Sequence, residues 1–100
     1  MVNTTTDIAR ICDKVKTLLI SKNLAYGDSA LNPVRIMSKA SPIEQILVRI
    51  DDKLSRITRG DVLTDDEDVI MDLIGYFIIL KIALERDAQD AYNETLPTDS

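Results

Sequence analysis

Several residue types on which much enzyme chemistry depends are absent or nearly absent from this 100-residue chain. It has no histidine, no tryptophan and one cysteine, Cys12. The lack of histidine excludes the usual zinc sites, histidine acid–base pairs and Ser-His-Asp triads, and one cysteine excludes an intrachain disulfide. Because Cys12 shares a helical face with Ile8 and Val15, we expect a buried structural thiol rather than a nucleophile.

Aromatic residues are also scarce, at 4% of the chain, whereas hydrophobic residues make up 45%. A core built from aliphatic side chains suits packed helices better than a small sheet rich in aromatic pairs. A chain of this length forms one domain. We therefore expect a single all-α domain over residues 1–92, followed by a disordered acidic tail over residues 93–100.

Positive charge is in the minority, with 12 basic against 17 acidic residues and a net charge of −5. Four of the acidic residues lie beyond Arg86, where no basic residue follows, which leaves 13 acids against 12 bases in the rest of the chain. A nearly neutral body argues against general binding to nucleic-acid backbones. It is compatible with a local site for a small anion.

Long hydrophobic runs and targeting signals are missing as well. The longest apolar run, Val69 to Leu84, is interrupted by Asp72, Gly75 and Lys81. It is shorter than the roughly 20 residues that a membrane-spanning helix needs. The N-terminus has neither a basic start nor an apolar signal core. We expect a cytoplasmic protein with no membrane partner.

The sequence contains start and stop signals for three helices. The first should start near Thr5 or Thr6, either of which can cap it, and end near Lys22. The second should begin at Ser41-Pro42-Ile43-Glu44, in which serine caps, proline suits the first helical position and Glu44 completes a capping box. It should run to about Arg59, where Gly60 can take the left-handed conformation that ends many helices.

The third helix should follow the capping sequence Thr64-Asp65-Asp66-Glu67 and continue through Leu84, or as far as Ala91. Between the first two helices, residues 24–40 contain Gly27, Asp28 and Pro33, which predict a long loop. The expected protomer is therefore a three-helix antiparallel bundle with a long loop between helices one and two.

The third helix also predicts self-association. Its apolar residues cover well over half of its circumference, and one neighbouring helix cannot bury so wide a surface. We expect a homo-oligomer in which third helices pack together. The narrow sector that remains includes Asp68, Asp72, Gly75, Tyr76 and Ala83, and its small residues allow another backbone or a ligand to approach closely.

One row of basic side chains suggests an anion site. Arg49, Lys53 and Arg56 recur at spacings of four and three residues on the second helix, beside an apolar stripe of Leu47, Ile50, Leu54 and Ile57. Such a row is also typical of a solvated helix surface. In the binding interpretation, arginine grips phosphate oxygens and a tyrosine stacks on a base. The candidate ligand-binding residues are Tyr26, Gly27, Ser29, Arg49, Lys53, Arg56, Asp72 and Tyr76.

Carboxylates offer a second chemistry. Mg²⁺ prefers oxygen ligands and can bridge the phosphates of a nucleotide, as in helical nucleotide pyrophosphohydrolases. Those enzymes use paired glutamates, whereas Glu44 and Glu67 here each occupy a capping position. Asp68 and Asp72 are the one acidic pair on the third helix that capping does not explain. We therefore name no catalytic residue and no cofactor for the binding hypothesis, and assign Mg²⁺ to Asp68 and Asp72 only in the enzyme alternative.

Three segments taken together resemble a known family. They are Lys22-Asn23-Leu24-Ala25-Tyr26-Gly27-Asp28-Ser29, then residues 47–56 around Arg49-Ile50-Asp51-Asp52-Lys53-Leu54, then residues 67–76 ending in Asp72-Leu73-Ile74-Gly75-Tyr76. This order is similar to the nucleotide modification associated domain, type one, a small family common in phages. The resemblance spans Lys22 to about Leu84. It implies a phage or prophage origin, the cytoplasm of a bacterial host and a link to nucleotides, and it supplies no established catalytic set.

Three functions follow as hypotheses. The first is a phage protein that binds a nucleotide or a nucleotide-derived ligand, such as a cyclic-nucleotide immune signal of the host, and sequesters it against host defence. The second is a Mg²⁺-dependent nucleotide pyrophosphohydrolase or an accessory to nucleotide modification. The third is a protein that inhibits a host enzyme through the surface of the third helix.

Overall fold

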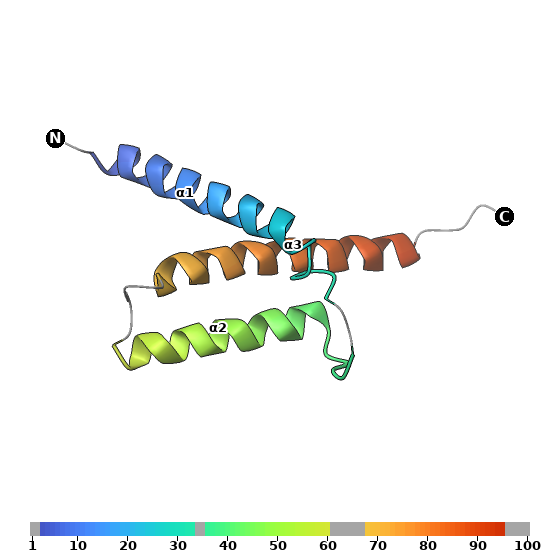
Figure 1. Cartoon of the computed structure of the whole chain (residues 1–100). Helices are drawn as coiled ribbons and strands as arrows, with labels where there is room; N and C mark the ends of the chain where they lie inside the picture. Colours follow the sequence, from blue (N-terminus) through green and yellow to red (C-terminus); the bar gives the residue numbers. More distant parts are fainter. Residues whose placement is uncertain (1–2, 34–35, 61–67, 96–100) are drawn as a thin grey trace.

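A computed structural model describes residues 3–33, 36–60 and 68–95, and the fold over these residues is all-α, as predicted. The described residues contain no strand and three helices (Figure 1). The helices are α1 (Thr4–Ala25), α2 (Pro42–Thr58) and α3 (Val69–Thr95).

The capping serine, the N-terminal proline and the C-terminal glycine predicted for α2 are confirmed. The Ser41 hydroxyl accepts a hydrogen bond from the Glu44 backbone N–H at 3.1 Å, and Pro42 occupies the first helical position. At the other end, Gly60 has a φ of +87°, the left-handed region that suits glycine after a helix.

The ends of α1 differ from the prediction. The cap is Asn3 rather than Thr5 or Thr6, because the Asn3 side-chain oxygen reaches the Thr6 N–H at 2.8 Å. Asparagine is among the strongest capping residues, and it starts the helix earlier than a threonine cap would. The helix continues past Lys22 to Ala25, which brings one more turn of side chains close to the loop that follows.

α3 also departs from the predicted limits. The predicted cap at residues 64–67 lies outside the described residues. In the structure, a carboxylate oxygen of Asp68 accepts the Met71 N–H at 3.0 Å, so Asp68 acts as the N-cap of α3. At the far end, α3 continues to Thr95, so residues 93–95 are helical rather than part of the predicted disordered tail. Residues 96–100 lie outside the described part of the chain.

α2 and α3 form an antiparallel hairpin that contains most of the core (Figure 1). The predicted apolar stripe of α2 was partly wrong, since Leu47 and Leu54 are exposed at 37% and 44%. The side of α2 that faces α3 is rotated toward the basic row, and Lys53 lies at its edge. The buried cluster consists of Ile46, Ile50, Val69, Leu73 and Ala83.

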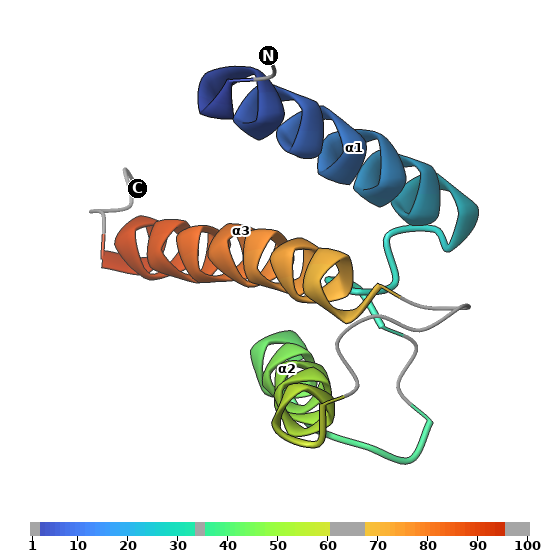
Figure 2. The same ribbon diagram turned by 90° about the vertical axis from the view of Figure 1, so that its left-hand side faces the viewer.

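α1 crosses α3 obliquely and does not approach α2 along its length (Figures 1 and 2). The antiparallel arrangement predicted for all three helices therefore holds for α2 and α3 only. At the crossing, a Cβ atom added to Gly75 would lie 2.9 Å from Leu19 Cδ2, so glycine is what lets α1 approach this closely. Away from the crossing α1 is uncovered, and Cys12 is exposed rather than buried as predicted.

The protomer is elongated. Its Cα radius of gyration is 17.1 Å, compared with about 13 Å for a compact domain of this length. Several large apolar side chains are exposed on α3, including Phe77, Ile78 and Leu84. Among the helices of the described residues, none has the length and apolar character needed to cross a membrane.

Candidate functional site

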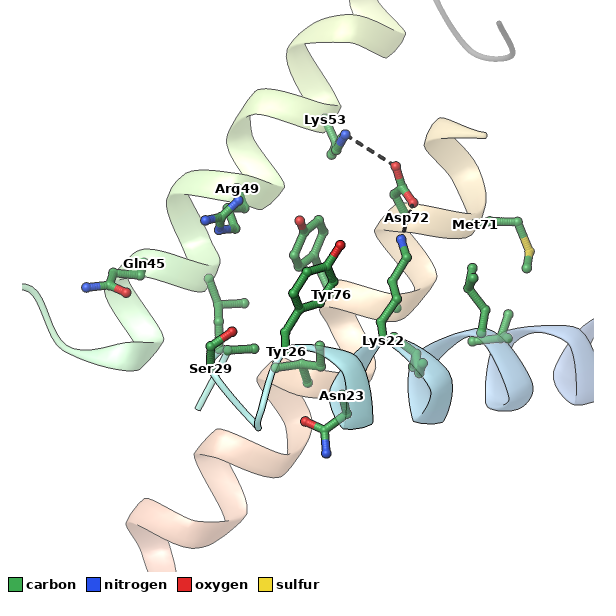
Figure 3. Close-up of a pocket in the computed structure, with 17 residues that line it drawn as sticks. Lys22, Asn23, Tyr26, Ser29, Gln45, Arg49, Lys53, Met71, Asp72 and Tyr76 are labelled. Atoms are coloured by element: carbon green, nitrogen blue, oxygen red, sulfur yellow. Dashed lines mark ion pairs between the residues drawn. The ribbon is translucent and has the colours of Figure 1, made fainter. Parts of the chain in front are cut away.

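A pocket of about 550 Å³ lies where the oblique crossing of α1 leaves space beside the α2–α3 hairpin (Figure 3). All three helices and the turn after α1 contribute side chains to it. The polar lining residues are Lys22, Asn23, Tyr26, Ser29, Gln45, Arg49, Lys53, Asp72 and Tyr76.

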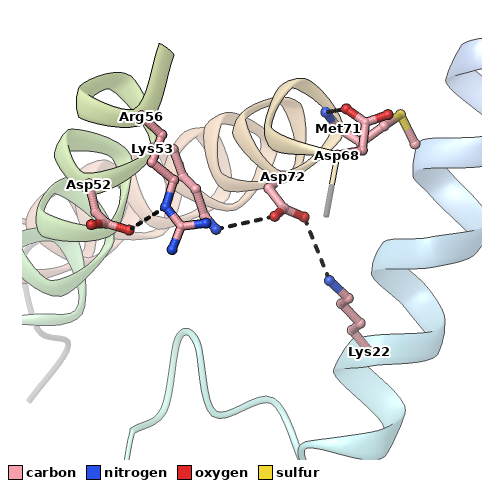
Figure 4. Close-up of polar contacts among 7 residues, drawn as sticks. All are labelled: Lys22, Asp52, Lys53, Arg56, Asp68, Met71 and Asp72. Atoms are coloured by element: carbon pink, nitrogen blue, oxygen red, sulfur yellow. Dashed lines mark hydrogen bonds and ion pairs between the residues drawn. The ribbon is translucent and has the colours of Figure 1, made fainter. Parts of the chain in front are cut away.

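One carboxylate joins the three helices at this pocket (Figure 4). Asp72 on α3 lies 3.3 Å from Lys53 Nζ on α2 and 3.8 Å from Lys22 Nζ on α1. The side chains of Lys53 and Asp72 are largely buried, whereas that of Lys22 is about half exposed. Asp72 therefore holds the two lysines near each other, and Lys22 is the more accessible of the two to an incoming anion.

Arg49 adds a third positive charge from α2. It lies one helical turn before Lys53 and its side chain lines the pocket (Figure 3). Within the described ranges, no ion pair or hydrogen bond occupies its guanidinium group. A guanidinium group presents a planar set of N–H donors that matches a phosphate or carboxylate group.

The turn after α1 positions Tyr26 and Ser29. Gly27 and Asp28 both have left-handed backbones, with φ values of +61° and +63°, which reverse the chain sharply at the end of the helix. The Asp28 carboxylate accepts a hydrogen bond from the Asn32 side chain at 2.6 Å and fixes the turn. Tyr26 is 70% exposed, so its ring is available to a ligand at the mouth of the pocket.

Tyr76 enters the same pocket from α3 (Figure 3). It is partly buried and packs against the core cluster, so the scaffold supports its ring. The pocket therefore contains two aromatic rings, one exposed and one supported by the core, next to three basic side chains. This combination suits a ligand with both an anionic group and a planar group.

The structure brings together most of the candidates named from sequence. Tyr26, Ser29, Arg49, Lys53, Asp72 and Tyr76 all line the pocket. Gly27 and Arg56 do not: Gly27 shapes the turn behind Tyr26, and the Arg56 side chain lies 3.8 Å from Asp52 on the same helix. Of the basic row of α2, Arg49 and Lys53 therefore line the pocket and Arg56 does not.

Sequence reasoning missed three polar lining residues, Lys22, Asn23 and Gln45. Lys22 and Asn23 lie at the predicted end of the first helix, where no apolar periodicity shows which way a side chain points. A lysine in the last turn of α1 is explained locally by the helix dipole, and its carboxylate partner is distant in sequence. The family-like segment that starts at Lys22 was the one available signal for it.

The two carboxylates considered for Mg²⁺ have other roles in the structure. Asp68 caps α3, contrary to the expectation that capping does not explain it, and Asp72 pairs with two lysines (Figure 4). Over the residues that the structure describes, no cluster of three or more histidine, cysteine or acidic side chains could hold a metal ion. A cation at Asp72 would have to displace the ammonium groups already there.

In comparisons with known proteins, no family, no curated protein and no solved structure matches this chain. The resemblance to the nucleotide modification associated domain, type one, therefore stays a prediction.

Proposed function

We propose that this protein binds a nucleotide or nucleotide-derived ligand in the pocket between α1, α2 and α3 and retains it without chemical change. The observation that carries the proposal is the local charge. The chain has a net charge of −5, yet among the residues that the structure describes its pocket is lined by Lys22, Arg49 and Lys53 against one acid, Asp72. Three bases against one acid attract an anion locally.

Shape and aromatic content support a nucleotide over a simple inorganic anion. A volume of about 550 Å³ lies within the usual range for small-molecule sites. In the proposed complex, Arg49 and Lys22 contact the phosphates, while Tyr26 and Tyr76 contact the base. The Lys53–Asp72 pair stays in place as the wall of the site, because both side chains are already largely buried.

Binding without turnover follows from the chemistry of the lining. Its side chains can orient phosphates and bases, but the one carboxylate among the described lining residues, Asp72, is engaged by two lysines. In a phage, such a protein would act by capturing a host cyclic-nucleotide signal. We also propose that the protein acts as a homo-oligomer associated through α3, because α3 exposes Phe77 and Leu84, each 50% accessible in the protomer.

A thermal-shift screen tests the binding proposal. The probes are ATP, cyclic di-AMP, cyclic ADP-ribose and adenosine, each with and without Mg²⁺. A ligand that binds only the folded protein raises its melting temperature, by an amount that grows with concentration over Kd. We expect a shift with at least one phosphorylated probe, none with adenosine, and recovery of the probe unchanged by chromatography. No shift with any nucleotide would contradict binding, and a chemically altered probe would indicate the hydrolase instead.

A further inference from the structure

α3 has neighbours on two sides of its circumference and an uncovered stripe on a third. α2 covers the side of Val69, Leu73 and Ala83, and α1 crosses the side of Gly75. The stripe between them runs along the whole helix and is mostly apolar. Its members are Ile70, Ile74, Phe77, Lys81, Leu84, Ala88, Ala91 and Thr95, all of which are exposed except Ile74, which is half-buried beside α1.

The stripe has the spacing of a coiled-coil seam. Successive members are four and three residues apart in strict alternation from Ile70 to Thr95. This spacing of 3.5 residues on average keeps one face of a helix against a partner helix. The pattern therefore fits a long helix as the partner, rather than a flat protein surface.

Part of α3 also needs such a partner. Every residue from Leu84 to Thr95 is exposed, and the helix extends there beyond the end of α2 (Figure 1). Isolated helices of about 12 residues are marginally stable in water, because packing of an apolar face supplies most of their stability. A second helix lying on the stripe would stabilise this segment.

The sizes of the side chains along the seam indicate the direction of the partner. The N-terminal half of the stripe carries the bulky Ile74 and Phe77, and the C-terminal half carries the small Ala88 and Ala91. In an antiparallel pair of identical helices, Phe77 of one copy meets Ala88 of the other, and Ile74 meets Ala91. Bulky side chains then fill the space beside small ones, whereas a parallel pair would align Phe77 with Phe77 and Ala88 with Ala88.

Charge supports the same register. Lys81 interrupts the apolar stripe, and its Nζ lies 3.4 Å from a carboxylate oxygen of Glu85 on the next turn. In the antiparallel register that sets Phe77 opposite Ala88, Lys81 of each copy comes opposite Leu84 and Glu85 of the other. Both lysines can then pair across the interface, which is the reciprocal pattern that a two-fold axis requires.

We infer that the uncovered stripe of α3 binds the same stripe of a second copy in antiparallel orientation, with the two-fold axis passing between Lys81 and Leu84. This inference rests on the proposed homo-oligomer and not on the proposed ligand. No member of the stripe lines the nucleotide pocket, whose α3 residues are Met71, Asp72, Gly75, Tyr76 and Ile79. Dimerisation therefore leaves both pockets of the dimer open.

Cysteine cross-linking tests the orientation. In the Cys12→Ser background, which removes the one native thiol, the variant with both Phe77→Cys and Ala88→Cys is compared with Phe77→Cys alone. Antiparallel pairing sets the thiol at position 77 of one copy opposite the thiol at position 88 of the other, within reach of a disulfide. The two thiols at position 77 are then about 16 Å apart along the axis, at roughly 1.5 Å per residue, and cannot join. Phe77 lies outside the buried cluster, so the variants should fold.

We expect the double variant to give a covalent dimer under mild oxidation and the single variant to stay uncross-linked. A covalent dimer from Phe77→Cys alone would indicate parallel helices and overturn the inference. Light scattering on the unmodified protein separates the remaining outcomes. An oligomer without cross-links would overturn the antiparallel seam but not self-association, and a monomer would overturn both. Nucleotide binding by a monomer would leave the pocket proposal standing.

Discussion

Lys53 Nζ lies 3.3 Å from Asp72 Oδ2, and their side chains are only 12% and 19% exposed. This pair joins α2 to α3 at the edge of the core, and Lys22 extends it to α1 at 3.8 Å. Removing one partner of a buried ion pair leaves the other charge poorly compensated, which costs more than the pair itself contributes. Of these three residues, Asp72 is the one that contacts side chains of both other helices, so its loss affects α1 and α2 together.

Asp72→Asn should therefore destabilise the fold more than Lys53→Met does. We expect Asp72→Asn to lower the free energy of unfolding by about 1–3 kcal/mol, the usual cost of leaving a buried polar group unsatisfied. In Lys53→Met the carboxylate of Asp72 keeps Lys22 as its partner. Urea denaturation of both variants at one pH and salt concentration gives the comparison. An equal loss in both, or a larger loss in Lys53→Met, would show that Asp72 does not hold the three helices together.

Gly75 should control how closely α1 approaches the pocket. Gly75→Ala brings a Cβ to 2.9 Å from the flexible end of Leu19, and the gain of about 1 kcal/mol in helix propensity offsets that crowding. Gly75→Leu cannot be accommodated so easily and should push α1 outward, together with Lys22 and Tyr26. We expect Gly75→Leu to weaken nucleotide binding about tenfold, or roughly 1.4 kcal/mol.

The comparison of the two Gly75 variants contains its own control. Circular dichroism should show both to be helical and folded, because most contacts between helices lie between α2 and α3. Calorimetric titration then measures the affinity of each. If Gly75→Leu binds the nucleotide as tightly as Gly75→Ala, the position of α1 does not shape the site.

The proposed dimer interface on α3 predicts that two charge variants associate better with each other than with themselves. Lys81→Glu gives a chain with two acids at the interface, and Glu85→Lys gives a chain with two bases. Both variants lose the ion pair within their own helix, and each homodimer places like charges opposite each other. Mixed in equal amounts, they should form a heterodimer with opposite charges across the axis.

Sedimentation equilibrium measures this effect. Surface ion pairs contribute about 0.2–1 kcal/mol each, so two pairs across the interface should place the dissociation constant of the mixture about twofold to thirtyfold below that of either variant alone. The Lys81–Glu85 pair within one helix is absent from every sample. Tighter association in the mixture must therefore come from a contact between two copies. Equal dissociation constants in all three samples would place Lys81 and Glu85 away from the interface.

Much of the fold follows from local sequence signals. Ser41, Pro42 and Gly60 bound α2 because capping and left-handed backbone depend on neighbouring residues alone. The true caps Asn3 and Asp68 were missed because several capping residues stand next to each other at both places. Propensity does not choose between such neighbours, since packing of the helix decides where its first turn begins.

The site was harder to predict than the helices. Arg49, Lys53 and Asp72 were found because helical spacing and the family-like segments mark them. Lys22 was missed since its role depends on how α1 crosses α3, which no local pattern contains. Because of the same crossing, Cys12 is exposed, and so is Ile8 in the N-terminal part of α1. Periodicity tells which side of a helix is apolar, but only the arrangement of the helices decides which part of that side is buried.

The measurement that tests the central claim most directly is calorimetric titration of Arg49→Ala. Arg49 lines the pocket and is exposed, so its loss should not change the melting temperature. Arg10→Ala removes the same charge from an exposed part of α1 away from this pocket. With whichever of ATP, cyclic di-AMP or cyclic ADP-ribose binds the unmodified protein, we expect Arg49→Ala to weaken binding at least about tenfold and Arg10→Ala to leave it unchanged. Equal affinity in Arg49→Ala and the unmodified protein would contradict the pocket as the nucleotide site.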